Sequence, residues 1–371
     1  MKFDKKTLFF SDSVISDLLK VTDVIPEQIV ENITHLEKHW RSVDFELKFE
    51  ITERCNLKCS FCHQEFGKRI NHKADFELED YKNIIDEAKQ EKQIKYVRIT
   101  GGEPLLHPNV KDFLQYATDA GYCTILNTNA TLLTAELISS IAPFVGIWKI
   151  SLPSYEDQKT NAITGVPDVW SKKINALQIL KEHNCVIDLL VVLTRSNIPH
   201  ISDFITVAKK YNATCSFLRQ ESNATERLPL AVADVEEMVH QLEQNKTQVG
   251  LAIPFCASTT PERLAAVAGG RIDCGPYSSL VISKKGKVHS CYSRRRIYDI
   301  KGGILKTAMR IAAEDFVSLP SICQKCRFGA VCLGGCRCGL TLKNSIAGLV
   351  DYLADFNSIS THINNTEGDL L

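Results

Sequence analysis

The sequence ELKFEITERCNLKCSFC, residues 46–62, joins an alternating apolar segment to a loop with three cysteines. Apolar and polar side chains alternate through residues 46–52, which is typical of a β-strand with one buried face. Cys55, Cys59 and Cys62 follow directly, with the spacing C-x3-C-x2-C. Thiols this close together indicate a metal or iron–sulfur site and not a disulfide framework. The segment therefore predicts a strand whose end carries a metal-binding loop.

Five more short apolar runs follow at intervals, and each is separated from the next by an amphipathic stretch. The runs predict strands at 96–100, 123–127, 146–152, 186–194 and 213–219. The stretches between them predict helices near 77–92, 109–120, 133–142, 168–184 and 199–211. Alternating strands and helices indicate parallel βα units. The fold class is therefore α/β, either a partial or complete barrel or an open doubly wound sheet.

Composition limits the functions of this 371-residue chain. Lys plus Arg and Asp plus Glu both number 44, so no net field attracts nucleic acid or an anionic membrane. We find no signal peptide and no apolar run long enough to span a bilayer. We therefore expect a cytoplasmic protein, in which disulfides rarely persist. Of the 14 cysteines, three lie singly in apolar runs and are predicted to be core thiols: Cys123, Cys185 and Cys215.

Polar loops follow each of the next four predicted strands, at 100–104, 127–130, 151–154 and 194–197. The carboxyl ends of parallel strands meet at one edge of a sheet, so these loops are expected to surround a common site together with the cysteine loop. In the first of them, Gly101 and Gly102 allow a ligand to approach the backbone closely. The next residue, Glu103, supplies an anion that can accept a hydrogen bond from an ammonium group.

The cysteine loop and the TGGEPLL segment (100–106) together resemble the radical S-adenosylmethionine (SAM) superfamily, and the resemblance covers residues 46 to about 340. It implies a partial (β/α)6 TIM-like barrel. It also implies that Cys55, Cys59 and Cys62 hold a [4Fe–4S] cluster whose remaining iron binds SAM. The alternative is zinc, which needs a fourth ligand nearby; His63 adjoins Cys62 and is too close to share its metal.

The resemblance further implies which residues bind SAM. Gly101, Gly102 and Glu103 would line its methionine end, with Glu103 receiving the ammonium. Four more residues would contact the adenine, the ribose or the carboxylate: Phe61, Asn129, Ser151 and Asn197. One departure is visible, because Thr164 stands where relatives have an arginine that contacts the carboxylate. Lys159 or Arg195 would then replace that arginine.

The cysteines of the C-terminal half match a second pattern, C-x(9–15)-G-x4-C followed by C-x2-C-x5-C-x3-C. This pattern resembles the SPASM domain, which holds auxiliary iron–sulfur clusters, here expected to be two of the [4Fe–4S] type. The first cluster would take Cys274, Cys291 and Cys336, and the second would take Cys323, Cys326 and Cys332. Each set lacks one ligand. Cys256 either completes the first set or is a core thiol. Cys338 completes the second, unless Asp351 or Asp355 does so or one iron stays open.

The segment between Cys274 and Cys291 predicts a hairpin around Lys285 and Gly286. The expected domains are a helical extension at 1–45, the barrel at 46–250, the SPASM domain at 251–345, and a C-terminal helix and tail at 346–371.

The expected function is reductive cleavage of SAM to a 5′-deoxyadenosyl radical that abstracts hydrogen from a substrate. The favoured substrate is a ribosomally made peptide, which would be cross-linked, epimerised or oxidised. One alternative is a dehydrogenase or epimerase of a small molecule such as an aminocyclitol or sugar; another is an iron–sulfur electron carrier.

The expected partners are an electron donor such as flavodoxin or ferredoxin, and a separate protein that recognises a leader peptide. No nucleic acid and no membrane is expected. No catalytic residue can be named, except that Cys256 or Cys338 could donate hydrogen if either is not a cluster ligand.

Overall fold

The computed structural model describes most of the chain between residues 42 and 351. The described residues are 35, 38, 42–62, 75–219, 230–247, 253–269, 277–283, 287–291, 297–317, 319, 321–333, 335, 342–345 and 348–351. Nearly all of the expected helical extension at 1–45 lies outside them. So do several residues of the predicted sites: His63, Cys274, Lys285, Gly286, Cys336, Cys338 and Asp355.

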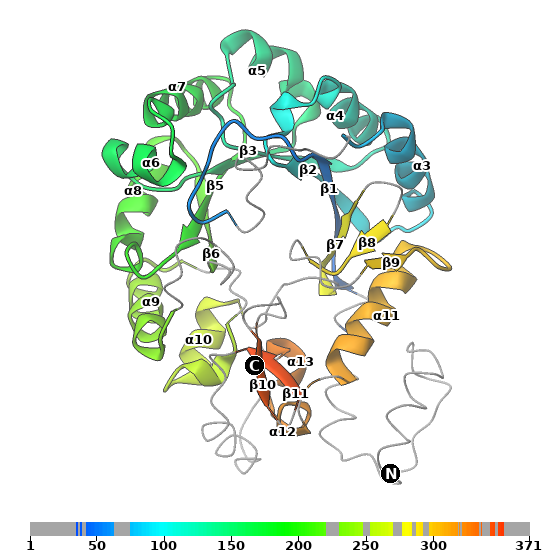
Figure 1. Cartoon of the computed structure of the whole chain (residues 1–371), viewed down its shortest axis with the longest axis vertical. Coiled ribbons are helices and arrows are strands. Elements are labelled where there is room, and N and C mark those ends of the chain that lie inside the picture. The colour runs from blue at the N-terminus through cyan, green and yellow to red at the C-terminus, as the bar shows by residue number, and fades with distance from the viewer. Residues whose placement is uncertain are drawn as a thin grey trace.

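Six parallel strands form the centre of the fold, as the sequence predicts. They are β1 (Phe45–Thr52), β2 (Ile94–Gly101), β3 (Cys123–Thr128), β4 (Ile147–Ser151), β5 (Ile187–Leu193) and β6 (Thr214–Arg219). Each strand is hydrogen-bonded to the next in chain order, and every pairing among the six is parallel. The sheet curves into an open barrel with helices around its outside (Figure 1). The predicted partial TIM-like fold is confirmed, and the barrel is not closed.

The helices between these strands agree with the predicted stretches. They are α3 (Leu78–Ala88), α4 (Val110–Asp119), α5 (Ala135–Ile141), α7 (Val169–Glu182) and α8 (Ile201–Lys210). A further helix, α6 (Asp157–Thr164), lies between β4 and α7, and α9 (Val232–Gln244) and α10 (Pro261–Val267) follow β6. Three short 3₁₀ turns follow strands or helices of the barrel: η2 (Pro104–Leu106), η3 (Ala142–Phe144) and η4 (Ile198–His200).

Alternation along β1 separates an apolar outer face from a polar inner face. Phe49 points outward, where the centroid of its ring lies 4.6 Å from the ring centroid of Tyr81 on α3. Its neighbours Leu47 and Ile51 are fully buried. Because successive side chains of a strand face opposite sides, Glu46 and Lys48 point to the inner face of the sheet. The apolar residues thus pack under the helices, and the interior of the barrel receives charges.

Three further strands extend the sheet beyond β1. β7 (Ser279–Ile282) pairs in parallel with β1, and β8 (Lys287–His289) and β9 (Ile297–Asp299) continue it in antiparallel order. The antiparallel pairing of β7 with β8 agrees with the predicted hairpin, whose turn lies outside the described residues. The pairing of β7 with β1 joins this hairpin to the barrel sheet.

The helix α11 (Ile304–Val317) is attached to the barrel through Glu91, which follows α3. The Glu91 carboxylate accepts hydrogen bonds from the backbone N–H groups of Ile304 and Leu305, both at 2.6 Å. A negative charge at a helix N-terminus satisfies unpaired N–H groups and interacts favourably with the helix dipole. No helix within the described ranges is both long and apolar enough to cross a membrane.

The last described elements are short. α12 (Ser321–Gln324) and α13 (Gly329–Cys332) carry the motif cysteines Cys323 and Cys332, and Cys326 lies between the two helices. The strands β10 (Leu342–Ser345) and β11 (Gly348–Asp351) form a separate antiparallel pair. The expected helix at 346–371 therefore does not extend over residues 348–351. Only two residues separate β10 from β11, which is the connection length of a tight hairpin.

Candidate functional site

The cysteine loop and the glycine loop lie against each other at the carboxyl edge of β1 and β2. The backbone N–H of Gly102 donates to the Thr52 carbonyl at 2.9 Å, and that of Glu103 donates to the Arg54 carbonyl at 2.7 Å. A Cβ atom on Gly102 would lie 2.2 Å from the Arg54 oxygen. One on Gly101, whose φ is +139°, would lie 2.2 Å from the Thr52 oxygen. Both glycines are therefore needed for this contact.

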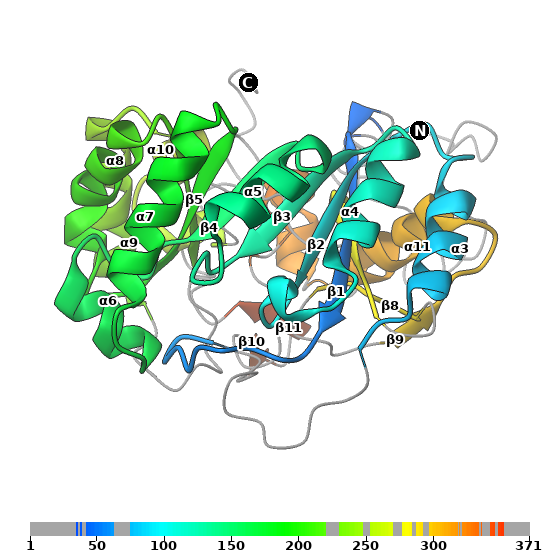
Figure 2. The same cartoon turned by 90° about the horizontal axis from the view of Figure 1, so that it is seen from above.

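The other side of the cysteine loop rests on the end of α6 (Figure 2). The N–H groups of Lys58 and Ser60 donate to the carbonyls of Thr164 and Ile163, both at 2.9 Å. The Thr164 hydroxyl donates to the Thr160 carbonyl at 2.8 Å within the helix. Thr164 thus holds the cysteine loop through its backbone carbonyl.

Glu103 is fully buried and links the loops that follow β2 and β3. One carboxylate oxygen accepts from the Thr128 hydroxyl at 2.7 Å and from the Leu105 N–H at 3.1 Å, and the other accepts from the Asn129 N–H at 2.7 Å. Burial raises the pKa of Glu103, although these three hydrogen bonds lower it in part. A buried carboxylate of this kind is stabilised in its ionised form by a nearby cation.

Asn129 connects the loop after β3 to the cysteine loop. Its side-chain N–H donates to the Asn56 side chain at 2.9 Å, and its side-chain oxygen accepts from the Thr131 N–H and hydroxyl at 2.9 and 2.6 Å. The Asn56 amide completes a ring of contacts by donating to the Thr131 hydroxyl at 2.8 Å. The structure thus brings Asn129 beside Cys55 and Asn56 of the cysteine loop.

Lys173 is a site residue that the sequence analysis missed. It comes from α7, is fully buried, and donates from Nζ to the carbonyls of Asn129 at 2.5 Å and Ser151 at 2.6 Å. Burial lowers its pKa to about 8, while Cys59 and Glu103 act in the opposite direction. A signal was available, because Lys173 occupies the buried face of α7 with Val169, Ala176, Leu177 and Leu180. A lysine on an otherwise apolar helix face needs a polar partner inside the protein.

The remaining predicted SAM contacts are spread over the same edge. Phe61 and Ser151 are half-buried, and Ser151 offers its carbonyl to Lys173. Asn197 closes its own turn, because its side chain accepts from the Thr194 N–H at 2.7 Å and donates to the Val192 carbonyl at 2.8 Å. The two candidate cations are paired with other carboxylates: Lys159 with Glu156 at 2.8 Å and Arg195 with Asp234 at 2.7 Å.

Cys55, Cys59 and Cys62 are half-buried thiols that influence one another electrostatically. Burial raises the pKa of Cys55 to about 11 and that of Cys59 to about 12. Within the described part of the chain, no three His, Cys, Asp or Glu side chains could hold a single metal ion. A [4Fe–4S] cluster differs in this respect, because each of its irons takes a separate thiolate. Three neighbouring thiols beside a buried cation fit such an anionic group.

The described cysteines of the second pattern lie in two places. Three of them are buried: Cys323 on α12, Cys332 on α13 and Cys326 in the turn between these helices. Cys291 is half-buried, two residues after the end of β8. Cys256 is also buried, on the 3₁₀ turn η5 (Phe255–Ala257). Its neighbour Phe255 donates its N–H to the Cys332 sulfur at 3.4 Å. The three isolated cysteines Cys123, Cys185 and Cys215 lie on or beside strands of the barrel and are half-buried.

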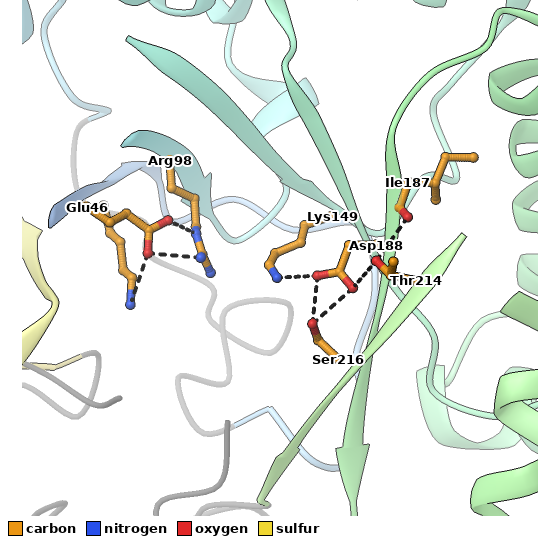
Figure 3. Close-up of polar contacts among 8 residues, drawn as sticks. Glu46, Arg98, Lys149, Ile187, Asp188, Thr214 and Ser216 are labelled. Atoms are coloured by element: carbon orange, nitrogen blue, oxygen red, sulfur yellow. Dashed lines mark hydrogen bonds and ion pairs between the residues drawn. The ribbon is translucent and has the colours of Figure 1, made fainter. Parts of the chain in front are cut away.

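The inner face of the sheet carries two groups of polar contacts (Figure 3). Arg98 on β2 binds Glu46 on β1 through Nε at 2.5 Å and through a terminal nitrogen at 2.9 Å. Lys149 on β4 forms an ion pair with Asp188 on β5, which also accepts from the hydroxyls of Thr214 and Ser216 on β6. The interior of this barrel is therefore charged, whereas closed TIM barrels fill theirs with branched apolar side chains.

Comparison with known proteins identifies the class of domain. Residues 49–208 match the model of the radical SAM superfamily, and this part of the chain is a radical SAM domain.

The chain is also similar in sequence to a maturase and a peptide cyclase and in fold to a solved structure. Mycofactocin maturase MftC of Mycobacterium tuberculosis is 32% identical over 176 residues, which is 47% of this chain and 44% of that protein. PqqA peptide cyclase of Bradyrhizobium diazoefficiens is 23% identical over 314 residues, or 78% of this chain and 80% of that one. This chain thus spans less than half of the maturase. The structure of Streptococcus suis SuiB bound to S-adenosylmethionine superposes with a TM-score of 0.65 and 17% identity, covering 93% of this chain and 88% of SuiB.

Proposed function

We propose that this protein is a radical SAM enzyme that modifies a ribosomally made peptide by cross-linking, epimerisation or oxidation. The observation that carries the proposal is the backbone contact between the cysteine loop and the Gly101–Glu103 loop. It puts three thiols beside a buried carboxylate and a buried lysine. A [4Fe–4S] cluster bound by Cys55, Cys59 and Cys62 would supply the electron that cleaves SAM to methionine and a 5′-deoxyadenosyl radical.

The protein residues bind and orient. Glu103 accepts a hydrogen bond from the ammonium group of SAM. A carboxylate has about four acceptor positions, and the protein's own donors occupy three of them, which leaves one for the ammonium. Gly101 and Gly102 keep the backbone beside the ligand free of side chains. Lys173 holds the ends of β3 and β4 together and places a positive charge beside Cys59. The remaining contacts to SAM are proposed for Phe61, Asn129, Ser151 and Asn197.

The relatives and the inner face of the barrel support a peptide as substrate. One of the relatives is by name a peptide cyclase and another a maturase, and SuiB has been crystallised with the precursor peptide SuiA. The ion pairs of Glu46 with Arg98 and of Lys149 with Asp188 offer charged and hydrogen-bonding groups to a polar chain. A flavodoxin or ferredoxin would donate the electron in the cytoplasm, and a separate protein would recognise the leader peptide.

We also propose a SPASM-type C-terminal domain with two auxiliary [4Fe–4S] clusters. Cys323, Cys326 and Cys332 are buried on α12, on α13 and in the turn between them, and would serve one of these clusters. Cys291 would serve the other, together with Cys274 and Cys336. The auxiliary clusters would accept an electron if the substrate is oxidised.

The test is SAM cleavage by anaerobically reconstituted protein with dithionite. The unaltered chain is expected to release 5′-deoxyadenosine, and Cys55→Ala to release none while keeping its auxiliary iron. Cys123→Ala is the matched control, because Cys123 is a half-buried thiol on β3 outside the cluster loop. Release by Cys55→Ala would refute the assignment.

The substrate class is tested by following deuterium. Short peptides encoded beside the gene are synthesised with deuterium at Cα and at their side chains, and one of them is expected to transfer it to 5′-deoxyadenosine. Transfer from a deuterated aminocyclitol or sugar, and from no peptide, would refute the peptide assignment while leaving SAM cleavage intact.

A further inference from the structure

We infer that Cys256 is the fourth ligand of the iron–sulfur cluster held by Cys323, Cys326 and Cys332. The inference rests on the proposed function, because it assumes that these three thiols bind a cluster. Sequence order favours Cys338, which follows the motif, and it leaves Cys256 as a core thiol or a ligand of the other auxiliary cluster. The tertiary contacts instead place Cys256 beside Cys332.

A hydrogen bond brings the Cys256 turn to the motif cysteines. The N–H of Phe255 donates to the sulfur of Cys332 at 3.4 Å, although the two residues are 77 positions apart in sequence. Cys256 is the next residue on the same 3₁₀ turn. Hydrogen bonds from backbone N–H groups to cluster sulfurs are one of the means by which proteins adjust cluster potentials. The contact therefore both locates Cys256 and suits a thiolate at Cys332.

The four thiols share one buried environment. Their residues are 6–8% exposed: Cys256, Cys323, Cys326 and Cys332. The Cys332 thiol interacts electrostatically with the thiols of Cys256, Cys326 and Cys323, which therefore lie near it. Four thiols are one complete ligand set for an iron–sulfur cluster.

Packing holds the Cys256 turn against α13. The rings of Phe255 and Phe328 meet edge to face with their centroids 5.5 Å apart. Arg327 forms an ion pair with Glu262 on α10 and lies over the Phe328 ring, with its guanidinium carbon 4.6 Å from the ring centroid. The aromatic contact thus joins the turn to the residue that precedes α13, and the ion pair joins α10 to the segment between α12 and α13.

A second set of contacts ties the same turn to α9. Glu236 accepts from the Ser258 hydroxyl at 2.9 Å and from the Thr259 N–H at 2.5 Å. The backbone that carries Cys256 is therefore held on both sides, by α9 and by α13. A ligand held in this way needs little reorganisation when the cluster binds.

Chain geometry also favours Cys256 over Cys338. If Cys338 were the ligand, Cys336 and Cys338 would serve different clusters with one residue between them, and an extended chain advances only about 6.6 Å over two residues. Cys256 comes from a separate segment and removes this constraint. With four thiolates, the cluster has no open iron for substrate, so its role is electron transfer, and Cys256 is not a hydrogen donor.

The experiment measures iron in full-length protein that lacks the SAM-site cluster, with Cys55, Cys59 and Cys62 all changed to alanine. This parent is expected to bind about eight irons per chain, which corresponds to two [4Fe–4S] clusters. In the same background, Cys256→Ala and Cys323→Ala are each expected to lose about half of them or to show the EPR signal of a [3Fe–4S] cluster, and the two changes together are expected to leave the second cluster intact. Cys338→Ala is expected to keep the parent's iron content and Mössbauer spectrum. Cys215→Ala, a half-buried core thiol on β6, is the matched control.

Cys256→Ser addresses folding, since serine keeps the size of the side chain. It is expected to alter the Mössbauer signal of one cluster in a chain whose circular dichroism matches the parent. Unchanged iron and spectra in both Cys256 variants would overturn the inference, and so would loss of a cluster in Cys338→Ala. Loss of both clusters in the chain with Cys256→Ala and Cys323→Ala would also overturn it, because Cys256 would then serve the other cluster. Because the parent lacks the SAM site, these results are independent of SAM cleavage. A parent without iron would overturn both the inference and the proposed auxiliary clusters.

Discussion

Substitution of Glu103 by glutamine tests the proposed ammonium contact. Glu103→Gln preserves the size and shape of the side chain but removes its charge and replaces one acceptor oxygen with an NH2 donor. In the structure both oxygens are used, one by Thr128 and Leu105 and the other by Asn129. In either orientation of the glutamine amide, at least one buried donor of the protein therefore faces the NH2 group.

Two separate free-energy changes follow from this geometry. Leaving one buried donor without an acceptor costs about 1–3 kcal/mol of folding stability. Losing a charge-assisted hydrogen bond to the ammonium of SAM costs roughly 1.5–3 kcal/mol of binding free energy. The second change corresponds to a dissociation constant for SAM that is roughly tenfold to 150-fold larger.

The assay is calorimetric titration of SAM into anaerobically reconstituted protein, with urea unfolding as the measure of stability. Thr128→Val is the matched control, because it removes the hydrogen bonds of the Thr128 hydroxyl with Glu103 and with the Ala130 N–H but leaves the carboxylate charged. We expect it to lower stability by about 1–3 kcal/mol, as Glu103→Gln does, and to leave SAM affinity nearly unchanged. If Glu103→Gln lowers stability but binds SAM as the unaltered protein does, Glu103 only connects the two loops and the ammonium assignment is wrong.

Three further predictions concern the same site. Lys173→Met is expected to lower the reduction potential of the SAM-site cluster, because reduction adds negative charge beside Cys59 and the substitution removes the cation that stabilises this charge. An EPR-monitored redox titration with an unchanged potential would contradict this. Gly102→Ala is expected to lose the SAM-site iron, because its Cβ would lie 2.2 Å from a carbonyl oxygen. Gly121→Ala has a strained backbone at φ +92° but no atom within 4 Å of the added Cβ, so it should keep that iron; equal iron contents would show that the close contact is unimportant. Cluster assembly at pH 8 is expected to release protons and to strengthen as pH rises, since burial raises the pKa of Cys55 to about 11 and that of Cys59 to about 12, so that both are neutral before iron binds. The release is measured with a pH indicator in weakly buffered solution, and its absence would show that these thiols ionise before binding.

The sequence by itself was sufficient for the parallel strands and their order of appearance. Strand and helix periods are local, because they depend on residues two to four positions apart. The six predicted barrel strands agree with β1–β6 to within two residues at each end. The predicted site region followed from the same rule, since parallel strands present their following loops at one edge. The spacing of Cys55, Cys59 and Cys62 is equally local.

Contacts between distant segments were decided by the tertiary structure alone. Lys173 follows the SAM-site cysteines by more than a hundred residues, and only the packing of α7 against the barrel brings its amine to the ends of β3 and β4. Sequence order likewise favoured Cys338 as a cluster ligand, because it is the cysteine that follows the C-x2-C-x5-C-x3-C motif in the chain. The contact of Phe255 with Cys332 instead depends on the folding of α9, α10 and α13 around one buried position. The hydrophobic period of a segment shows which of its faces is buried, but which other segment packs against that face depends on how the whole chain folds.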